Sequence, residues 1–437
     1  MQSPKPGLMH RLLLWRRSVD PILLSIAVAC FPIKLGLDTV LLAFFGGVGI
    51  YLICGWHRSR QLIDPHYAAA SLAYGGVVVA IGLYHGNVIE NLRWIGLPLY
   101  FSLGIALFVG FVLIRNPVRQ MALGARVGLI LTVGMALFES FMGETRIGLG
   151  GNAANAAFVI CVLAVMARFH ASNAPKYLPN SRAWFYFAII PVLMTGTRSV
   201  LPIFVIAAFI DIIELRTELF TAARKLGARR LTVAGAAGLV VIAAGAYETR
   251  DIVSSRIAYT MLEMGNLTGP SDKETTGLDI RINLWKGAID VVREYPLLGV
   301  GGKESMERIK QNIPDPNASL YADFVHVHFF ALDEMRDRGI VGLVFLIGLF
   351  AVVFTRIFRT TDHPMRVNMA IFLALLVLYG SLHGLLFSDR NLAIIVLVFV
   401  GALAGARRSR FSILMNPDGE SSIDRSNLTP LTRNSLA

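Results

Sequence analysis

Apolar runs close to 20 residues long recur along most of this sequence of 437 residues. A helix needs about 20 apolar residues to cross the hydrocarbon core of a bilayer. The composition agrees, because 55% of the residues are hydrophobic and only 16% are charged, whereas a soluble globular chain carries about 25% charged residues. These features exclude a single soluble domain, a disordered chain and a fibrous one. They predict an all-α, polytopic integral membrane protein.

We expect about twelve membrane-spanning helices, and very tight turns join three pairs of them into helical hairpins. The predicted spans are 18–34, 37–56, 67–85, 94–114, 127–142, 153–168, 183–196, 200–214, 231–248, 340–356, 367–386 and 391–406.

The distribution of Lys and Arg supports this number of spans and sets the orientation. With the N-terminus in the cytoplasm, the cytoplasmic segments hold 25 of the 41 basic residues, the short outward loops hold 5, and one long outward loop holds 11. Basic residues gather in the cytoplasmic loops of membrane proteins. Both termini are therefore predicted to be cytoplasmic. The net charge of +12 is a topology signal, and we predict no nucleic-acid partner.

The predicted organisation has four parts. Residues 1–248 hold the first nine spans, 249–339 form one large outward loop, 340–406 hold the last three spans, and 407–437 form a disordered cytoplasmic tail. The loop carries 11 basic and 14 acidic residues. It is too long for a structureless connection, so we expect it to fold. Its amphipathic stretches predict two helices, Arg281–Glu294 and Val325–Arg338.

One outward cation is Arg198, which lies in the polar break Thr195–Ser199 between two apolar runs. A guanidinium at the membrane boundary must pair with an anion or extend to the interface. Its planar fork matches the oxygens of phosphate. Arg198 is therefore a candidate phosphate ligand, and extension toward lipid headgroups is the alternative.

Two histidines, His326 and His328, lie just before the tenth span, and only His85 and His383 are also near the outer face. A histidine titrates near neutral pH and can take a proton from a hydroxyl group. A pair of hydrogen-bonded structural histidines is the alternative. We predict no metal site, because no third ligand lies at a recognisable spacing.

The long loop contains further basic residues, most of which we expect to be solvated or paired with its acidic residues. Arg281 is a better candidate for an inward role, because it lies among apolar residues in Ile280–Trp285. Lys303 and Arg336 are weaker candidates. The glycine cluster 298–305 lacks the spacing of a nucleotide P-loop. We therefore expect a tight turn or a close backbone approach to a ligand there, and we predict no cofactor.

Two other outward segments hold weaker candidates. Arg146, Asn152 and Asn155 lie before the sixth span, where amides cap the helix by default or bind sugar hydroxyls. Asp389 and Arg390 lie in the last outward turn. This turn is either a self-contained ion pair and cap, or part of a site.

Taken together, these segments resemble the O-antigen ligase family, within the larger superfamily of O-antigen ligases and polymerases. The stretch 146–155 is similar to the family's Arg–Gly–Asn-rich entry to a middle span, and 195–199 to its small-polar–Arg turn. Arg281 with Trp285, followed by the run 296–301, resembles the family's Arg…Trp…Pro-Leu-x-Gly-x-Gly pattern. The resemblance covers about 140 to 390.

The family's His–Asn–x–x–Leu…Gly–x–x–Gly signature has a similar counterpart from His328 to Gly342. Aligning on Leu332 and Gly339 assigns the key position to His328. The chain departs from the pattern at Phe329, where the family has Asn.

The resemblance implies a GT-C-like membrane glycosyltransferase on the periplasmic face of the bacterial inner membrane. It would transfer O-antigen from undecaprenyl pyrophosphate to lipid A–core oligosaccharide, with both substrates held among membrane lipids. His328 would act as general base, and Arg198 and Arg281 would bind the pyrophosphate. The reaction would be inverting and metal-independent, since the sequence has neither an assignable carboxylate pair nor an Asp-x-Asp.

Three alternatives remain open. An O-antigen polymerase shares the superfamily, but such enzymes tend to have two sizeable outward loops. A protein O-oligosaccharyltransferase often has a larger C-terminal region. A transporter of lipid-linked sugars belongs to another class, and transporters usually place charged or helix-breaking residues at mid-membrane. In this sequence the polar groups concentrate at the outer boundary and in one loop.

Overall fold

The computed structural model describes residues 8–33, 36–55, 57–86, 92–144, 146–216, 277–313, 321 and 323–415. Within these ranges the regular structure is entirely helical. Seven of the described helices are long and apolar enough to cross a bilayer, and three shorter apolar helices accompany them. The polytopic membrane class is therefore confirmed. The predicted span 231–248 lies outside the described residues.

The described helices are given in chain order. They are α1 Leu8–Cys30, α2 Leu37–Gly55, the 3-10 helix η1 His57–Leu62, α3 Pro65–Tyr84, α4 Leu92–Gly96, α5 Tyr100–Val112, α6 Pro117–Phe141, α7 Ala153–Ala167, α8 Ala183–Phe187, α9 Ile189–Met194, α11 Gly277–Glu294, α12 Gly302–Gln311, α13 Phe330–Thr360, α14 His363–Gly380 and α15 Asp389–Met415. Residues 202–216 are also helical.

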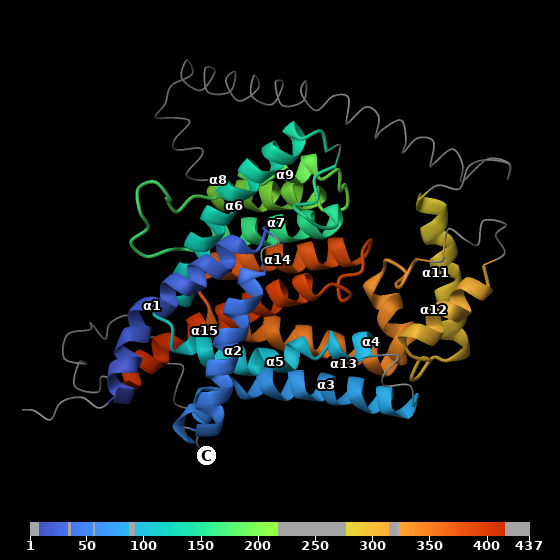
Figure 1. Ribbon diagram of the computed structural model, residues 1–437, viewed down its shortest axis with the longest axis horizontal. Helices are drawn as coiled ribbons and strands as arrows, with labels where there is room; N and C mark the ends of the chain where they lie inside the picture. Colours follow the sequence, from blue (N-terminus) through green and yellow to red (C-terminus); the bar gives the residue numbers. More distant parts are fainter. Residues whose placement is uncertain are drawn as a thin grey trace, which may run out of the picture.

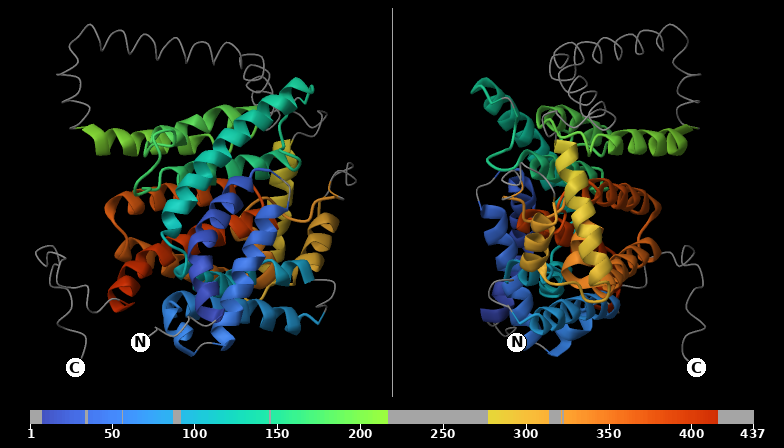
Figure 2. Two further views of the ribbon diagram at one scale, coloured as in Figure 1. Left: turned by 60° about the vertical axis from the view of Figure 1, so that its left-hand side comes forward. Right: turned by 90° about the vertical axis from the view of Figure 1, so that its right-hand side faces the viewer.

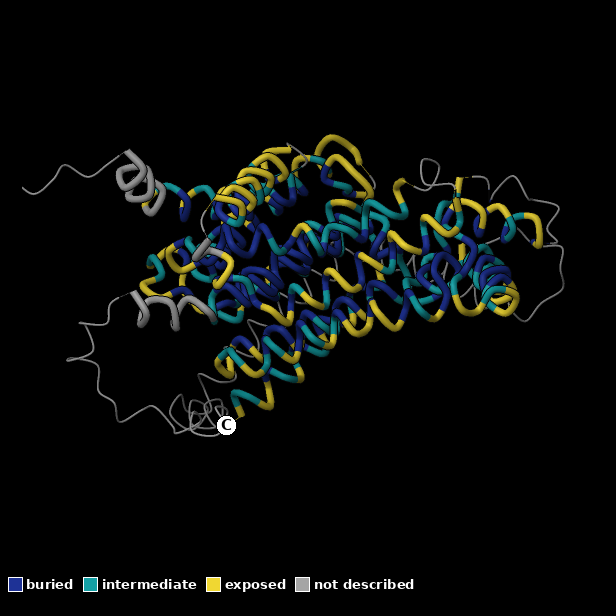
Figure 3. Tube along the Cα trace, turned by 90° about the horizontal axis from the view of Figure 1, so that it is seen from below, coloured by how far each residue is buried: buried dark blue, intermediate teal, exposed yellow. Residues whose placement is uncertain are grey.

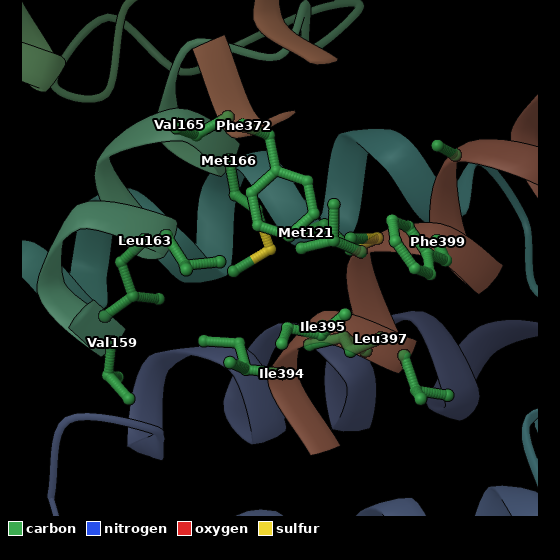
Figure 4. Packing of buried hydrophobic residues seen from close by; sticks show 14 of the residues in the cluster. Met121, Val159, Leu163, Val165, Met166, Phe372, Ile394, Ile395, Leu397 and Phe399 are labelled. Atoms are coloured by element: carbon green, nitrogen blue, oxygen red, sulfur yellow. The ribbon is translucent and has the colours of Figure 1, made fainter. Parts of the chain in front are cut away.

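The long helices pack as a bundle (Figure 1). Helix α1 packs on α6, α2 and α15 pack on α5, and α3 packs on α13. Helix α7 is buried along nearly its whole length. Its side chains pack with those of α6, α14 and α15 (Figure 4). The peripheral helices turn apolar side chains such as Val40, Leu72 and Val344 outward, and exposed positions follow the outer side of the bundle (Figure 3). An apolar outer surface suits lipid as solvent.

Helices α11 and α12 lie across one end of this bundle, at the right of Figure 1, and Figure 2 shows α11 from that side. They pack on each other and on α13. A second apolar cluster joins them, including Leu284, Met306, Ile309 and Val327. The described part of the long loop is therefore folded, as expected. We call this end of the bundle the histidine end, because α13 begins there directly after His326 and His328.

Several helix boundaries differ from the prediction. Helix α6 begins at Pro117, well before the predicted start at 127, because buried Arg126 donates to the backbone oxygens of Ala167, Phe169 and Leu178. Its charge therefore does not exclude it from the helix. Helix α14 ends at Gly380, so the predicted span overran into the following turn.

Two further boundaries were also wrong. The second amphipathic helix begins at Phe330 rather than Val325, because the peptide of Val327 bonds to side chains instead of continuing a helix. Helix α15 continues to Met415, so the beginning of the predicted disordered tail is helical. The rest of that tail lies outside the described residues.

Helix α13 is broken at Gly339, whose φ of 64° and ψ of −167° lie outside helical geometry. The turn Pro296–Gly301 fills this break. The amide of Ile340 donates to Pro296 O at 2.8 Å, and Val300 and Gly301 donate back to the carbonyls of Arg336 and Asp337 at 3.1 and 3.0 Å. Gly299 and Gly301 have positive φ. The glycine cluster is therefore a tight turn that approaches α13.

We expect Gly339→Ala to destabilise the protein. A Cβ at this position would overlap the carbonyl of Leu297, and the positive φ alone costs about 1–3 kcal/mol. Thermal unfolding of the purified protein in detergent should show a lower midpoint. Gly348→Ala in the same helix is the control, because a Cβ there meets nothing within 4 Å and alanine favours a helix. Equal midpoints for the two variants would contradict this account.

Candidate functional site

The segment before α13 presents two histidines on one side. Trp285 of α11 donates from Nε1 to Val327 O at 2.8 Å, and Val327 N donates to Asp333 Oδ1 at 2.8 Å. Val327 is buried beneath the segment. His326 and His328 flank Val327, and their side chains are only half-buried. Their ring centroids lie 4.2 Å apart.

The backbone of His328 is strained. Its φ is 61°, a left-handed conformation that costs a side-chain-bearing residue about 1–2 kcal/mol. Strain of this kind persists only where the surroundings enforce it, and it clusters at functional sites. In this segment, the hydrogen bonds on Val327 and the ring of Phe324, whose centroid lies 5.5 Å from that of His328, hold the conformation.

A third imidazole, His383, completes the cluster from the turn between α14 and α15. Its ring centroid lies 6.3 Å from that of His328, and its Nε2 shares a hydrogen bond of 2.8 Å with Ser199 Oγ. The sequence prediction placed His383 near the outer face but did not select it. The overestimated length of the eleventh span placed it inside an apolar helix. Across the described residues, no group of His, Cys, Asp and Glu has a metal-binding arrangement.

Three of the predicted arginines lie around this cluster. The charges of Arg281 and Arg146 both act on His383, and Arg281 also acts on His328. Arg146 Nε donates to Thr195 O at 2.8 Å and so holds the polar break 195–199. Arg198 is exposed and directly precedes Ser199, which the bond to His383 ties to the cluster. Segments far apart in the sequence thus converge at the histidine end.

Burial keeps these imidazoles neutral. It lowers the pKa of His326 to about 4 and those of His328 and His383 to about 3. Neighbouring positive charges act in the same direction, chiefly Arg336 on His326 and Arg281 on His383. The Nδ1 atoms of His326 and His328 are buried and accept or donate no hydrogen bond within the described part of the chain. A neutral ring can accept a proton from a bound molecule.

The weaker amide candidates have internal roles. Asn152 is the N-cap of α7, as the default interpretation predicts, and accepts from Ala154 N at 2.8 Å. Asn155 lies one turn further, where its Oδ1 accepts from Tyr379 Oη at 2.8 Å and from Asn391 Nδ2 at 3.2 Å. These bonds join α7, α14 and α15 directly beneath His383, whose ring stacks on that of Tyr379.

The charged weaker candidates divide between the interior and the surface. Arg336 is fully buried, with Asp333 and Asp337 at 3.0 and 3.1 Å, so its guanidinium is used inside the protein. Lys303 is exposed on the first turn of α12. Asp389 accepts from the backbone of Arg390, and the side chain of Arg390 donates to the carbonyl of Phe31, the residue directly after α1. The last outward turn therefore caps α15 and ties it to α1.

The fold defines a polytopic α-helical membrane protein with a half-buried cluster of imidazoles at one end of its bundle, and arginines lie around that cluster. Residues 183–347 match the family model described as O-antigen ligase. This match confirms the resemblance to the O-antigen ligase family that the sequence motifs indicate. The match contains Arg198, Arg281 and both histidines before α13, whereas Arg146 and His383 lie outside it. No curated protein matches the chain.

The lowered histidine pKa values predict that stability falls as the medium is acidified from pH 7 to pH 5. The unfolded chain takes up protons near the ordinary histidine pKa of about 6.5, whereas the folded protein does so only near 3 to 4. Protonation therefore favours unfolding in this window. The unfolding midpoint should fall as the pH is lowered from 7 to 5. In His328→Gln it should fall less steeply. An unchanged slope in His328→Gln would contradict the prediction.

Proposed function

We propose that the protein is an O-antigen ligase, which transfers a glycan from undecaprenyl pyrophosphate to lipid A–core oligosaccharide on the periplasmic face of the inner membrane. One observation carries the proposal. A strained, neutral His328 lies beside Arg281, and both belong to the segment that matches the ligase family. The proposal places the histidine end at the periplasmic side, in agreement with the distribution of basic residues.

The chemistry requires one proton transfer and one charged leaving group. A hydroxyl of the acceptor sugar attacks the anomeric carbon of the donor, the bond from that carbon to the pyrophosphate oxygen breaks, and the hydroxyl proton passes to His328. Direct displacement inverts the anomeric centre. The proton then leaves to solvent or to the released pyrophosphate. General-base catalysis of this kind contributes about 10²- to 10⁴-fold to the rate.

Arg281 and Arg198 are the proposed ligands of the pyrophosphate. Guanidinium groups bind phosphate oxygens through two parallel N–H···O bonds, and such cations stabilise the charge that develops on the leaving group. Arg281 acts on His328 from α11, and Arg198 lies beside Ser199 on the opposite segment. A pyrophosphate between these two arginines would lie against the imidazoles.

The same arrangement gives the donor a second role. In the resting site the pKa of His328 is held low, at about 3, by burial and by neighbouring positive charge, which makes it a weak base. A bound pyrophosphate would supply negative charge and favour the imidazolium form. The base would thus gain strength only when a donor is present, which protects the site from unproductive protonation.

The function is tested with the purified full-length protein, a lipid-linked glycan and lipid A–core. Glycan attached to lipid A–core supports the ligase. Longer lipid-linked glycan supports a polymerase of the same superfamily instead. Glycan appearing on a periplasmic protein supports a protein O-oligosaccharyltransferase. Absence of every product overturns the proposal.

His328→Ala should lower kcat by about 10²-fold or more, because the proton acceptor is removed. His326→Ala should have a smaller effect, because the family alignment places the base at His328 while His326 stacks on Phe387. Both variants should be compared with wild type in the transfer assay after their folding is verified by thermal unfolding. Wild-type activity in folded His328→Ala would refute the assignment of the base.

Arg281→Lys should weaken donor use, because a single ammonium cannot replace a two-pronged contact. We expect kcat/KM for the donor to fall by about tenfold to a hundredfold, with little change in KM for the acceptor. Arg293→Lys is a matched control on the same helix, since that side chain is 77% exposed and pairs with Asp290. Equal losses in the two variants would argue against a role for Arg281 at the pyrophosphate.

A further inference from the structure

His383 joins two parts of the site that the chain itself leaves far apart. On one side its Nε2 bonds to Ser199 Oγ at 2.8 Å, next to Arg198. On the other side its ring faces that of His328, with centroids 6.3 Å apart. It therefore lies between the proposed pyrophosphate ligand and the proposed base.

The support beneath His383 is rigid. Its ring stacks on Tyr379 with a centroid distance of 4.7 Å, and Tyr379 is only 1% exposed. Tyr379 Oη donates to Asn155 Oδ1, which also accepts from the fully buried Asn391. A polar network that joins packed helices restricts the positions of its members. His383 is thus anchored to α7, α14 and α15 together.

Arg146 also anchors the segment that His383 holds. Arg146 donates to the carbonyl of Thr195 at 2.8 Å, and its second nitrogen lies 3.5 Å from Thr197 Oγ1. These contacts hold the beginning of the polar break. The bond to Ser199 holds its end, beyond Arg198.

We propose that His383 is a positioning residue, which fixes the pyrophosphate-binding turn 195–199 against the general base through its hydrogen bond to Ser199. The inference rests on the proposed function and deepens it. Displacing a catalytic or binding group by about 1 Å can cost on the order of 100-fold in rate, so a single bond at this place has a large effect. The charged and titratable groups that act on His383 are Arg281, Arg146, His328 and His326.

The test is a mutant cycle in the transfer assay with the full-length protein. His383→Ala should lower kcat/KM for the donor by about 10- to 100-fold, and Ser199→Ala by about five- to tenfold. KM for the acceptor should change little. The double variant should be no worse than His383→Ala, because both substitutions remove the same bond. His383→Gln, which keeps an amide near the position of Nε2, should recover part of the loss.

Ser381→Ala is the matched control, because Ser381 lies in the same turn and its hydroxyl donates to Val377 O in the preceding helix, α14. It should retain wild-type activity. Multiplicative losses in the double variant would overturn the inference, as would an equal rise of KM for both substrates. Equal loss in His383→Gln and His383→Ala would also overturn it, since the imidazole itself would then be required.

A second measurement separates this inference from the proposed function. An inactive wild-type protein would overturn the ligase proposal, but the binding of undecaprenyl pyrophosphate can still be measured with the protein in nanodiscs. Weaker binding by Ser199→Ala and His383→Ala, with Ser381→Ala unchanged, would support the positioning role. Identical dissociation constants for all four proteins would refute it.

Discussion

The arrangement of the histidine end depends on one buried guanidinium. Arg336 pairs with Asp333 and Asp337, and it donates to Gly302 O at 3.1 Å and to Val325 O at 3.3 Å. It therefore joins α12, the segment before α13 and α13 itself. A buried charge is tolerated only when its partners are all present, so these three parts must fold together. Asp333 also accepts from the backbone amide of Val327. The ion pair between Arg336 and Asp333 therefore also fixes the direction in which the two histidines face.

Much of this fold could be predicted from the sequence, because hydrophobic length and basic residues are strong signals in a membrane protein. The apolar runs predicted most of the described helices. The described part of the long loop 249–339 is folded. The ends of helices were harder to predict where a charge was satisfied inside the protein. Arg126 was assigned to a loop because its carbonyl partners lie 41 to 52 residues further along the chain.

The candidate site was predicted in part for the same reason. His328, Arg198 and Arg281 stand out as polar residues in apolar surroundings. His383 and Ser199 do not, because their importance comes from a bond between residues 184 positions apart. One signal in the sequence could have indicated His383. Tyr379 is a polar residue within an apolar run, and it lies four residues before this histidine. Arg336 shows the opposite case. Its residue type suits a substrate-binding role, but its guanidinium pairs with carboxylates inside the protein.

The position of α7 has a consequence for substrate traffic. Since this helix is surrounded by protein along nearly its whole length, it has no side along which an acyl or prenyl chain can slide. If the proposed function holds, both lipid-anchored substrates would approach the histidine end around the rim of the bundle, within the plane of the membrane. Donor and acceptor would then meet by diffusion in the plane of the membrane, and this diffusion would end at the histidine end. The reaction rate would then depend on the surface density of each lipid rather than on its bulk concentration.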